Sequence, residues 1–336
     1  MAIPLQRAAQ DGSPVLVQGP RGAGKSTLLR QEFPDRLFID LDAAADRTSA
    51  RRDPDAFLGR LRRPAILDNL QRAPEMVRYL HYNGIHLPVV FASSIRLRLA
   101  MATLELHPPT RAERQRRPAL SIAMLGRFVP SAPFTSELPP AWPLTRNLLQ
   151  QDVRQLVSLD DPDLFDSFLA AVEALTGQPL QQQDLARQIG VSHRTVVRWL
   201  EILDACFLTL RLEPWDDGLG RRLVRRPKLH WLGSSASFET EVVTEIYRNA
   251  CHAGLTPVMR YWRDSNGLEV PLLLEADPAA EPVPIGIAES PNPATEARLL
   301  RWMDLAGVSR GALIGRKTQL LERRSTRVLR YGWEHL

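Results

Sequence analysis

Short apolar runs alternate with segments of helical periodicity through the first third of the chain. The runs lie at residues 15–17, 37–39, 65–67 and 88–91. Such alternation is typical of a parallel β-sheet covered by helices. Each run is followed by polar residues, and ligands of open α/β sheets bind at the carboxyl ends of the strands. The pattern therefore predicts an α/β domain with a ligand site at that edge of its sheet.

The pattern changes twice further along the chain. Residues 107–145 are rich in proline, which predicts a lid or connector rather than core. An amphipathic helical region follows up to residue 212. The remainder mixes two helical stretches, at 238–250 and 294–305, with strand candidates. The strand candidates lie at 259–262, 270–274 and 283–287. We therefore expect three domains, which span residues 1–145, 146–232 and 233–336.

The first apolar run leads into a phosphate-binding motif. Residues 19–26 read GPRGAGKS, which matches GxxxxGK followed by Ser or Thr between a predicted strand and a predicted helix. Backbone N–H groups of such a loop point at phosphates, and the helix N-terminus adds a favourable field. The residues expected to contact ATP are Gly19, Pro20, Arg21, Gly22, Ala23, Gly24, Lys25, Ser26 and Thr27. The alternative is a glycine-rich turn that binds no ligand.

An acidic residue ends the third apolar run, as a phosphate-loop site requires. Lys25 is expected to reach the β- and γ-phosphates, while Ser26 and Asp68 are expected to hold Mg²⁺. The candidate catalytic residues are therefore Lys25, Asp68 and the residue that follows it, Asn69.

Composition places the chain in an ordinary class. Of its 336 residues, 44% are hydrophobic and 24% are charged, as in soluble globular proteins. No apolar run reaches the roughly 18 residues needed to span a bilayer, and the first residues lack the pattern of a secretory signal. Cys206 and Cys251 lie far apart without metal-site spacing, so we expect free thiols in a reducing compartment. These features predict a cytoplasmic protein without a membrane span.

Residues 183–203 predict a helix-turn-helix. Asp184 is expected to cap the first helix, Gly190 to supply the turn and Ser192 to cap the second helix. Apolar residues recur along the second helix at i, i+4 and i+7, so its opposite face is expected to be exposed. The candidate DNA contacts are His193, Arg194 and Arg198 for the major groove, and Arg221, Arg222, Arg225 and Arg226 for the backbone beside a wing.

Two other interpretations of this region remain. Helix-turn-helix modules also serve as spacers or protein-docking units, and a basic run can be a solvated edge strand protected by its charge. Residues 1–145 carry 20 basic and 13 acidic side chains, whereas the remainder carries 23 and 25. The net charge of +5 therefore does not come from the helix-turn-helix. The charge balance alone does not imply that this segment binds DNA, and DNA stays one candidate partner.

Segments from along the whole chain resemble the prokaryotic AAA-type ATPases that carry a winged helix and a C-terminal domain of unknown function. They are residues 19–26, 66–75 (ILDNLQRAPE), 183–203, 222–229, 238–243 and 261–264. The resemblance implies an α/β fold: a P-loop, AAA-like parallel sheet, then a winged helix-turn-helix and a small α/β domain of the restriction-endonuclease type. It implies ATP and Mg²⁺ as cofactors. It also implies that Ser93 or Ser94 senses the γ-phosphate, although a serine pair after a strand can equally be a simple turn.

Several positions depart from that family pattern. The family places a glutamate that activates the attacking water where this chain has Asn69, and an amide cannot accept a proton. In the terminal domain Pro271, Gly286 and Ala288 replace an aspartate, a glutamate and a lysine, and we expect Glu275 alone of the acids to remain. General-base catalysis contributes about 10²–10⁴-fold. We therefore predict slow or absent ATP hydrolysis and no nuclease activity.

Three functions are compatible with these features. The leading hypothesis is an ATP-binding switch or scaffold, a pseudoenzyme whose terminal domain docks a protein partner. The second is an active, DNA-stimulated ATPase in which Asn69 orients water and another acid serves as base. The third is an accessory subunit of a larger assembly, docked through the basic stretch at 310–330. An oligomer, in which an arginine from the neighbouring subunit completes the site, is compatible with each.

Overall fold

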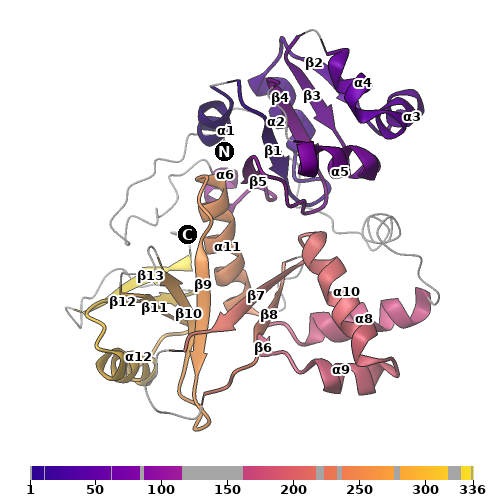
Figure 1. Cartoon of the computed structure of the whole chain (residues 1–336). Coiled ribbons are helices and arrows are strands. Elements are labelled where there is room, and N and C mark those ends of the chain that lie inside the picture. The colour runs from indigo at the N-terminus through magenta and orange to yellow at the C-terminus, as the bar shows by residue number, and fades with distance from the viewer. Residues whose placement is uncertain are drawn as a thin grey trace.

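The computed structural model describes residues 2–10, 12–61, 63–83, 87–115, 162–216, 223–232, 237–275, 281–316, 327–333 and 336. Two sheets organise the described part of the chain, one of five strands and one of eight. The five-stranded sheet lies in the N-terminal part, and the larger sheet lies below it with a group of helices at its side in the view of Figure 1.

Five parallel strands form the first sheet, in the order β2-β3-β4-β1-β5. The strands are β1 (Val15–Gln18), β2 (Leu37–Asp40), β3 (Ala65–Asp68), β4 (Val89–Ser93) and β5 (Ala102–Glu105). The helices around them are α1 (Ala2–Ala9), α2 (Lys25–Glu32), α3 (Ala44–Arg52), α4 (Pro54–Gly59), α5 (Pro74–Asn83) and the 3₁₀ helix η1 (Leu70–Arg72). The predicted parallel α/β sheet is confirmed.

Helices cover both faces of this sheet, so that its inner strands β1, β3 and β4 are buried on both sides. Val15 and Val17 of β1 pack with α1 and α2, whereas Leu16, between them, packs with α3, α4 and α5. This is the two-sided burial that a continuous apolar strand requires. Strand β5 was not anticipated because it lies at the edge of the sheet, where its first two residues, Ala102 and Thr103, are exposed.

The helical region after the connector contains α8 (Pro162–Ala174), α9 (Gln182–Ile189) and α10 (His193–Ala205), with the strands β6 (Gln178–Pro179), β7 (Thr209–Pro214) and β8 (Lys228–Trp231). Gly190 ends α9 in the left-handed conformation, with φ 80°, and the Ser192 hydroxyl accepts the Thr195 N–H to cap α10. Both features were predicted. The proposed Asp184 cap was wrong, because α9 begins after Gln181. Asp184 lies within the first turn of α9 and pairs with Arg187, one turn further along the helix.

The larger sheet has the strand order β13-β12-β11-β10-β9-β7-β8-β6. Its remaining strands are β9 (Val258–Arg263), β10 (Glu269–Glu275), β11 (Val283–Ala288), β12 (Gly311–Gly315) and β13 (Val328–Gly332). Strand β7 pairs in parallel with β9, so the sheet continues across residue 232. Helix α11 (Phe238–His252) packs with Leu272 and Leu274, and α12 (Pro293–Ala306) packs with Leu273 between them. The two helices therefore cover opposite faces.

The first described residues of the expected connector belong to the core. His107 and Thr110 are 1% and 0% exposed, and α6 (Arg111–Gln115) follows them. The Arg111 N–H donates to the Glu245 carboxylate on α11. The expectation of a lid or connector is thus wrong for residues 107–110, and residues 116–145 lie outside the described part. Among the described helices, none is long and apolar enough to cross a bilayer.

Candidate nucleotide-binding site

The phosphate loop joins β1 to α2 at the carboxyl edge of the first sheet. Gly22 and Gly24 adopt left-handed backbone conformations, with φ of 78° and 91°. Gly24 lies directly before α2, so the chain turns sharply into the helix there. A Cβ atom at Gly19 would lie 1.8 Å from the Leu106 carbonyl oxygen, so only glycine permits this close approach of the loop to the segment after β5.

Lys25 lies in the interior of this loop. Its side chain is 8% exposed, and its Nζ atom donates to the carbonyl oxygens of Gly19 and Pro20 at 2.8 and 2.9 Å. Lys25 is also the first residue of α2, where the unpaired N–H groups of a helix N-terminus favour anions. The loop therefore presents a cation and a helix N-terminus on the same side.

Ser26 and Asp68 lie next to each other, as their predicted shared role requires. The Ser26 hydroxyl donates to the Asp68 carboxylate at 2.5 Å. Asp68 ends β3 and is 4% exposed, and its second oxygen accepts the Asn69 N–H at 2.9 Å. A hydroxyl and a carboxylate are the hard oxygen ligands that Mg²⁺ takes beside a nucleotide. The donor set therefore fits this ion.

Asn69 makes a contact that the sequence did not reveal. Its amide nitrogen donates to the Asp40 carboxylate at 2.9 Å, and its amide oxygen accepts from Gln71 at 3.1 Å. Asp40 ends β2 and is paired in register with Asp68 of β3. Asn69 itself has φ 59°, a left-handed conformation that asparagine tolerates better than most side chains. A second carboxylate thus lies beside Asp68, held by the residue that replaces the expected glutamate.

The serine pair after β4 divides into two different environments. The Ser93 hydroxyl is occupied in a turn, donating to the Ile95 carbonyl at 2.7 Å. The Ser94 hydroxyl is buried and has no hydrogen-bond partner within the described part of the chain, while the Ser94 N–H donates to Gln71 at 3.2 Å. Of the two residues, Ser94 therefore has the hydroxyl that is available to a ligand.

Glu75, the other acid near this site in sequence, is engaged elsewhere. It lies in the first turn of α5 and forms a two-point ion pair with Arg51 of α3, at 3.0 and 3.1 Å. The hydrogen bond from Arg51 holds the pKa of Glu75 below its usual value. A carboxylate in this arrangement is a poor proton acceptor, so Asp40 is the better placed acid.

A polar cluster connects the nucleotide side of the sheet to the rest of the molecule. Glu105 ends β5 and accepts from Arg96 and from the hydroxyl of Tyr247 on α11, both at 2.7 Å. Burial acts to raise the pKa of Glu105. The hydrogen bond from His107 and the charge of Arg96 outweigh that effect and bring this pKa below its usual value. The Arg96 guanidinium lies 4.6 Å from the Phe207 ring centre, and the backbone N–H of Arg96 donates to the Ala205 carbonyl. Arg96 follows Ser94 by two residues, so β4 leads directly to the end of α10.

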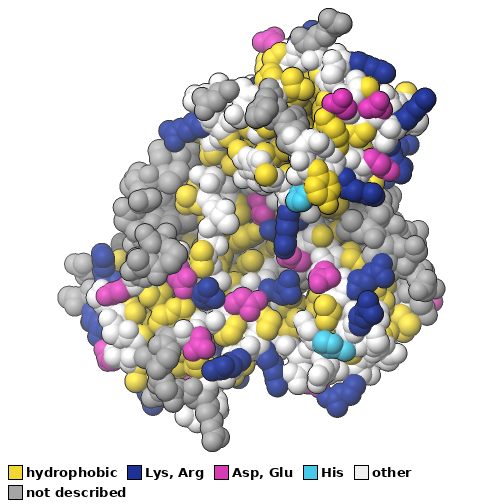
Figure 2. Space-filling view, viewed as in Figure 1, with side chains coloured by type: hydrophobic (Ala, Val, Ile, Leu, Met, Phe, Trp, Pro, Cys, Tyr) yellow, Lys and Arg dark blue, Asp and Glu magenta, His cyan; other side chains and the backbone are white. Residues whose placement is uncertain are grey.

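The candidate nucleic-acid contacts on α10 are exposed. His193, Arg194 and Arg198 all lie on the surface, and His193 shares a hydrogen bond with Gln182 at 3.1 Å. The opposite face of α10 is buried, as its periodicity predicted. Figure 2 shows basic side chains over the region of α9 and α10 with acidic ones beside them.

The basic run before β8 is only partly described. Arg225 and Arg226 are exposed, and Arg225 lies 3.7 Å from Asp216. Arg221 and Arg222 lie outside the described residues.

In the terminal region one of the positions expected for nuclease chemistry, Gly286, is packed with apolar groups. A Cβ atom at Gly286 would lie 2.9 Å from the Leu313 side chain and 3.5 Å from that of Leu299. A larger side chain there would therefore meet the core beneath α12 rather than a cleft.

The expectation that Glu275 alone of the acids remains was incomplete. Lys228, only 1% exposed, lies within ion-pair distance of both Glu239 and Glu269, with 2.6 Å to Glu239. Burial raises the pKa of Glu239 despite that lysine. Glu275 instead pairs with Arg260 at 3.2 Å. The three residues Lys228, Glu239 and Glu269 come from β8, α11 and β10, which explains why spacing along the chain did not indicate the cluster.

Comparison with known proteins gives the class of the first domain. Residues 11–113 match a family model described as an AAA domain, and residues 143–235 match one described as a domain of unknown function (DUF8612). Two proteins named as uncharacterized, from Mycobacterium tuberculosis and Mycobacterium bovis, are each 26% identical to this chain over 249 residues. That match covers 68% of this chain and 56% of each relative, so the chain spans about half of their length. The N-terminal region is thus an AAA-type domain, the ATP-binding class that its phosphate loop predicted.

Proposed function

We propose that this protein is an ATP-binding switch or scaffold that hydrolyses ATP slowly or not at all. The observation that carries the proposal is Asn69, which stands next to Asp68 at the expected position of the base and donates its amide to Asp40. The elements for binding are all present: Lys25 within the loop, and Ser26 beside Asp68 as ligands for Mg²⁺. Mg²⁺ would neutralise phosphate charge there, while these side chains position the nucleotide.

The same contacts provide a route by which bound nucleotide affects the rest of the chain. Ser94 is the candidate for contact with the γ-phosphate, since its hydroxyl is buried and has no partner among the described residues. Two residues later, Arg96 contacts both Ala205 at the end of α10 and Glu105. A shift of Ser94 toward phosphate would therefore act on the helical region through a short, packed connection.

The terminal region fits a docking role better than a catalytic one. Pro271 supplies no metal ligand, and Gly286 and Ala288 supply no acid or base. Leu299 and Leu313 fill the space beside Gly286. A nuclease needs acids that hold a metal near an activated water. The two acids that do lie together here, Glu239 and Glu269, are both ion-paired with the buried Lys228, so we propose that this region binds a partner protein and does not cut nucleic acid.

The switch proposal is tested with a non-hydrolysable ATP analogue. A ligand at 100 times its Kd stabilises the state that it binds by about 2.7 kcal/mol. At about 2–4 °C per kcal/mol, the melting temperature should rise by about 5–10 °C. Cleavage by a protease within residues 94–115 and 193–216 should slow in the same titration. Unchanged melting and unchanged cleavage at saturating analogue would contradict the proposal.

A second candidate is a DNA-stimulated ATPase, and two observations favour it. Asp40 is a carboxylate paired in register with Asp68 and in contact with the Asn69 amide, which makes it a candidate for the base. In addition, α10 exposes Arg194 and Arg198 on the face that a winged helix-turn-helix would insert into the major groove.

Removal of these two arginines tests the DNA contact. Each phosphate contact contributes about one unit to the slope of log K against log salt. If both arginines contact phosphate, the Arg194→Ala/Arg198→Ala variant should lower that slope by about 2, measured by fluorescence anisotropy with duplex DNA. The matched control is Arg298→Ala/Arg301→Ala, which removes two exposed arginines from α12. Equal effects of the two double variants would show non-specific attraction and contradict a contact through α10.

A further inference from the structure

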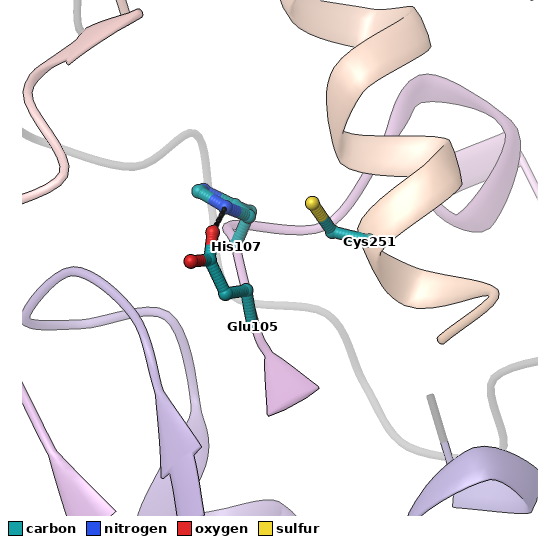
Figure 3. Close-up of side chains that lie close together, drawn as sticks. All are labelled: Glu105, His107 and Cys251. Carbon is teal, nitrogen blue, oxygen red and sulfur yellow. Dashed lines mark hydrogen bonds and ion pairs between the residues drawn. The ribbon is translucent and has the colours of Figure 1, made fainter. Parts of the chain in front are cut away.

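A group of potential metal ligands lies where the AAA-type domain meets the terminal region. Glu105 ends β5, His107 follows two residues later, and Cys251 comes from the last turns of α11. Figure 3 shows the Cys251 thiol on the side of its helix that faces the other two residues. His107 and Cys251 are 1% and 4% exposed, so the group is buried. It joins residues 144 positions apart in the chain and plays no part in the nucleotide site.

The three ligand atoms of this group lie close enough together for one ion. One ligand atom from each residue lies within 4.8 Å of the other two. His107 Nε2 and Glu105 Oε2 lie 3.4 Å apart, in a long hydrogen bond that coordination to a shared ion would replace. Two ligands bound tetrahedrally to Zn²⁺ at about 2.0–2.1 Å lie about 3.3–3.4 Å apart. The imidazole and the carboxylate are therefore already at the separation that such an ion needs.

Neighbouring residues hold two of the three ligands, the Glu105 carboxylate and the His107 backbone, in place, as the outer partners of metal ligands do. Arg96 donates to Glu105 Oε1, and Tyr247 donates to Oε2. A carboxylate oxygen has two lone-pair directions, so Oε2 can keep the Tyr247 hydrogen bond and still bind an ion on the His107 side. The backbone of His107 is fixed by His252, whose Nε2 atom lies 3.0 and 3.1 Å from the His107 nitrogen and oxygen.

The ligand types select the ion. A thiolate and an imidazole with one carboxylate suit Zn²⁺, whereas Mg²⁺ and Ca²⁺ take oxygen ligands. Binding would release the thiol proton of Cys251 to solvent, because the thiolate is the ligand. The two anionic ligands would then balance the charge of the ion, and a water molecule would supply the fourth ligand.

We propose that Glu105, His107 and Cys251 bind one Zn²⁺ ion, which fastens the AAA-type domain to α11. The site is separate from the phosphate-binding residues, since none of its three ligands belongs to the phosphate loop or to the Asp68 edge, although Glu105 also accepts from Arg96 on the proposed route from the nucleotide. Its effect is structural: the ion connects β5, the neighbour of the phosphate-loop strand, to the terminal region.

Cobalt and zinc binding to the full chain test this proposal. Protein dialysed with Zn²⁺ should retain about one ion per chain by mass spectrometry of metals. Co²⁺ in its place should give the near-ultraviolet charge-transfer absorption of a thiolate ligand. The Cys251→Ser variant should lose that absorption and lower zinc affinity by at least 10-fold. The matched control is Cys206→Ser, since Cys206 is the second buried thiol, also 4% exposed, and lies in the helical region.

Three results would overturn the proposal. The first is the absence of a thiolate–cobalt absorption in the wild-type protein. The second is an absorption of the Cys251→Ser variant equal to that of the wild-type protein. The third is equal zinc retention by the wild-type protein and this variant, which would indicate an adventitious ion only. The wild-type spectrum decides the matter even if a variant folds poorly. A His107→Ala variant provides a further check, because it should also lower zinc affinity while leaving both thiols in place.

Discussion

Replacement of Lys25 by alanine is expected to weaken ATP binding by about 10- to 100-fold. The Lys25 ammonium lies inside the loop, 2.8 and 2.9 Å from the Gly19 and Pro20 carbonyl oxygens. From there it can exchange one of these contacts for a phosphate oxygen. Hydrogen bonds to charged groups contribute about 1.5–3 kcal/mol, which corresponds to the stated loss. The binding constant is best measured by calorimetry with Mg²⁺ and a non-hydrolysable analogue.

The control for this substitution is Gln31→Ala, an exposed residue on the same helix α2. It should leave the affinity within twofold of the wild-type value. Melting temperatures of both variants show whether the loop has collapsed, because the Lys25 side chain also ties the loop carbonyls together. Wild-type affinity in a folded Lys25→Ala protein would mean that ATP does not bind at this loop.

A double substitution, with asparagine at position 40 and glutamate at position 69, is expected to raise ATP hydrolysis by about 10²–10⁴-fold. This is the usual contribution of a positioned general base. The Asp40→Asn/Asn69→Glu variant keeps one carboxylate and one amide in contact but moves the carboxylate next to Asp68. Asn69→Glu alone should gain less, because the new carboxylate would face Asp40, the present partner of the Asn69 amide, at close range. Phosphate release from Mg·ATP measures all three proteins.

The matched control is Asp40→Asn alone, which removes a carboxylate without adding one. If the wild-type protein is a switch, this control should leave its low rate unchanged. If Asp40 is the base of a working ATPase, the same control should lower the rate by about 10²-fold or more. A glutamate at position 69 takes a left-handed backbone conformation at a cost of about 1 kcal/mol, so nucleotide binding must be checked alongside the rate.

The sequence predicted the first domain well because local patterns specify it. Its first four strands are apolar runs, three of them buried on both faces, and GPRGAGKS has the glycines and the lysine that a phosphate loop needs. Ser26 and Asp68 do lie side by side, because the carboxyl ends of the parallel strands β1 and β3 meet at one edge of the sheet. The helices α9 and α10 were equally clear from the Gly190 turn and the Ser192 cap.

Contacts between distant segments could not be predicted in this way. Asp40 was visible as the polar end of an apolar run, but its contact with Asn69 depends on β2 lying beside β3. The group of Glu105, His107 and Cys251 forms only when α11 packs against the segment after β5. Strand β5 lacked an apolar run because it lies half exposed at the sheet edge. In each case the tertiary fold, rather than spacing in the chain, determines the neighbour.

The most direct test of the central claim is a single-turnover experiment with radiolabelled Mg·ATP and excess wild-type protein. Typical enzymes turn over about 10 times per second, and loss of the base lowers that by about 10²–10⁴-fold. We predict that the wild-type protein, which has Lys25, binds ATP, keeps it bound and hydrolyses it at about 10⁻¹ per second or slower. A single-turnover rate constant of several per second, lost in the Lys25→Ala variant, would show an active ATPase and contradict the switch.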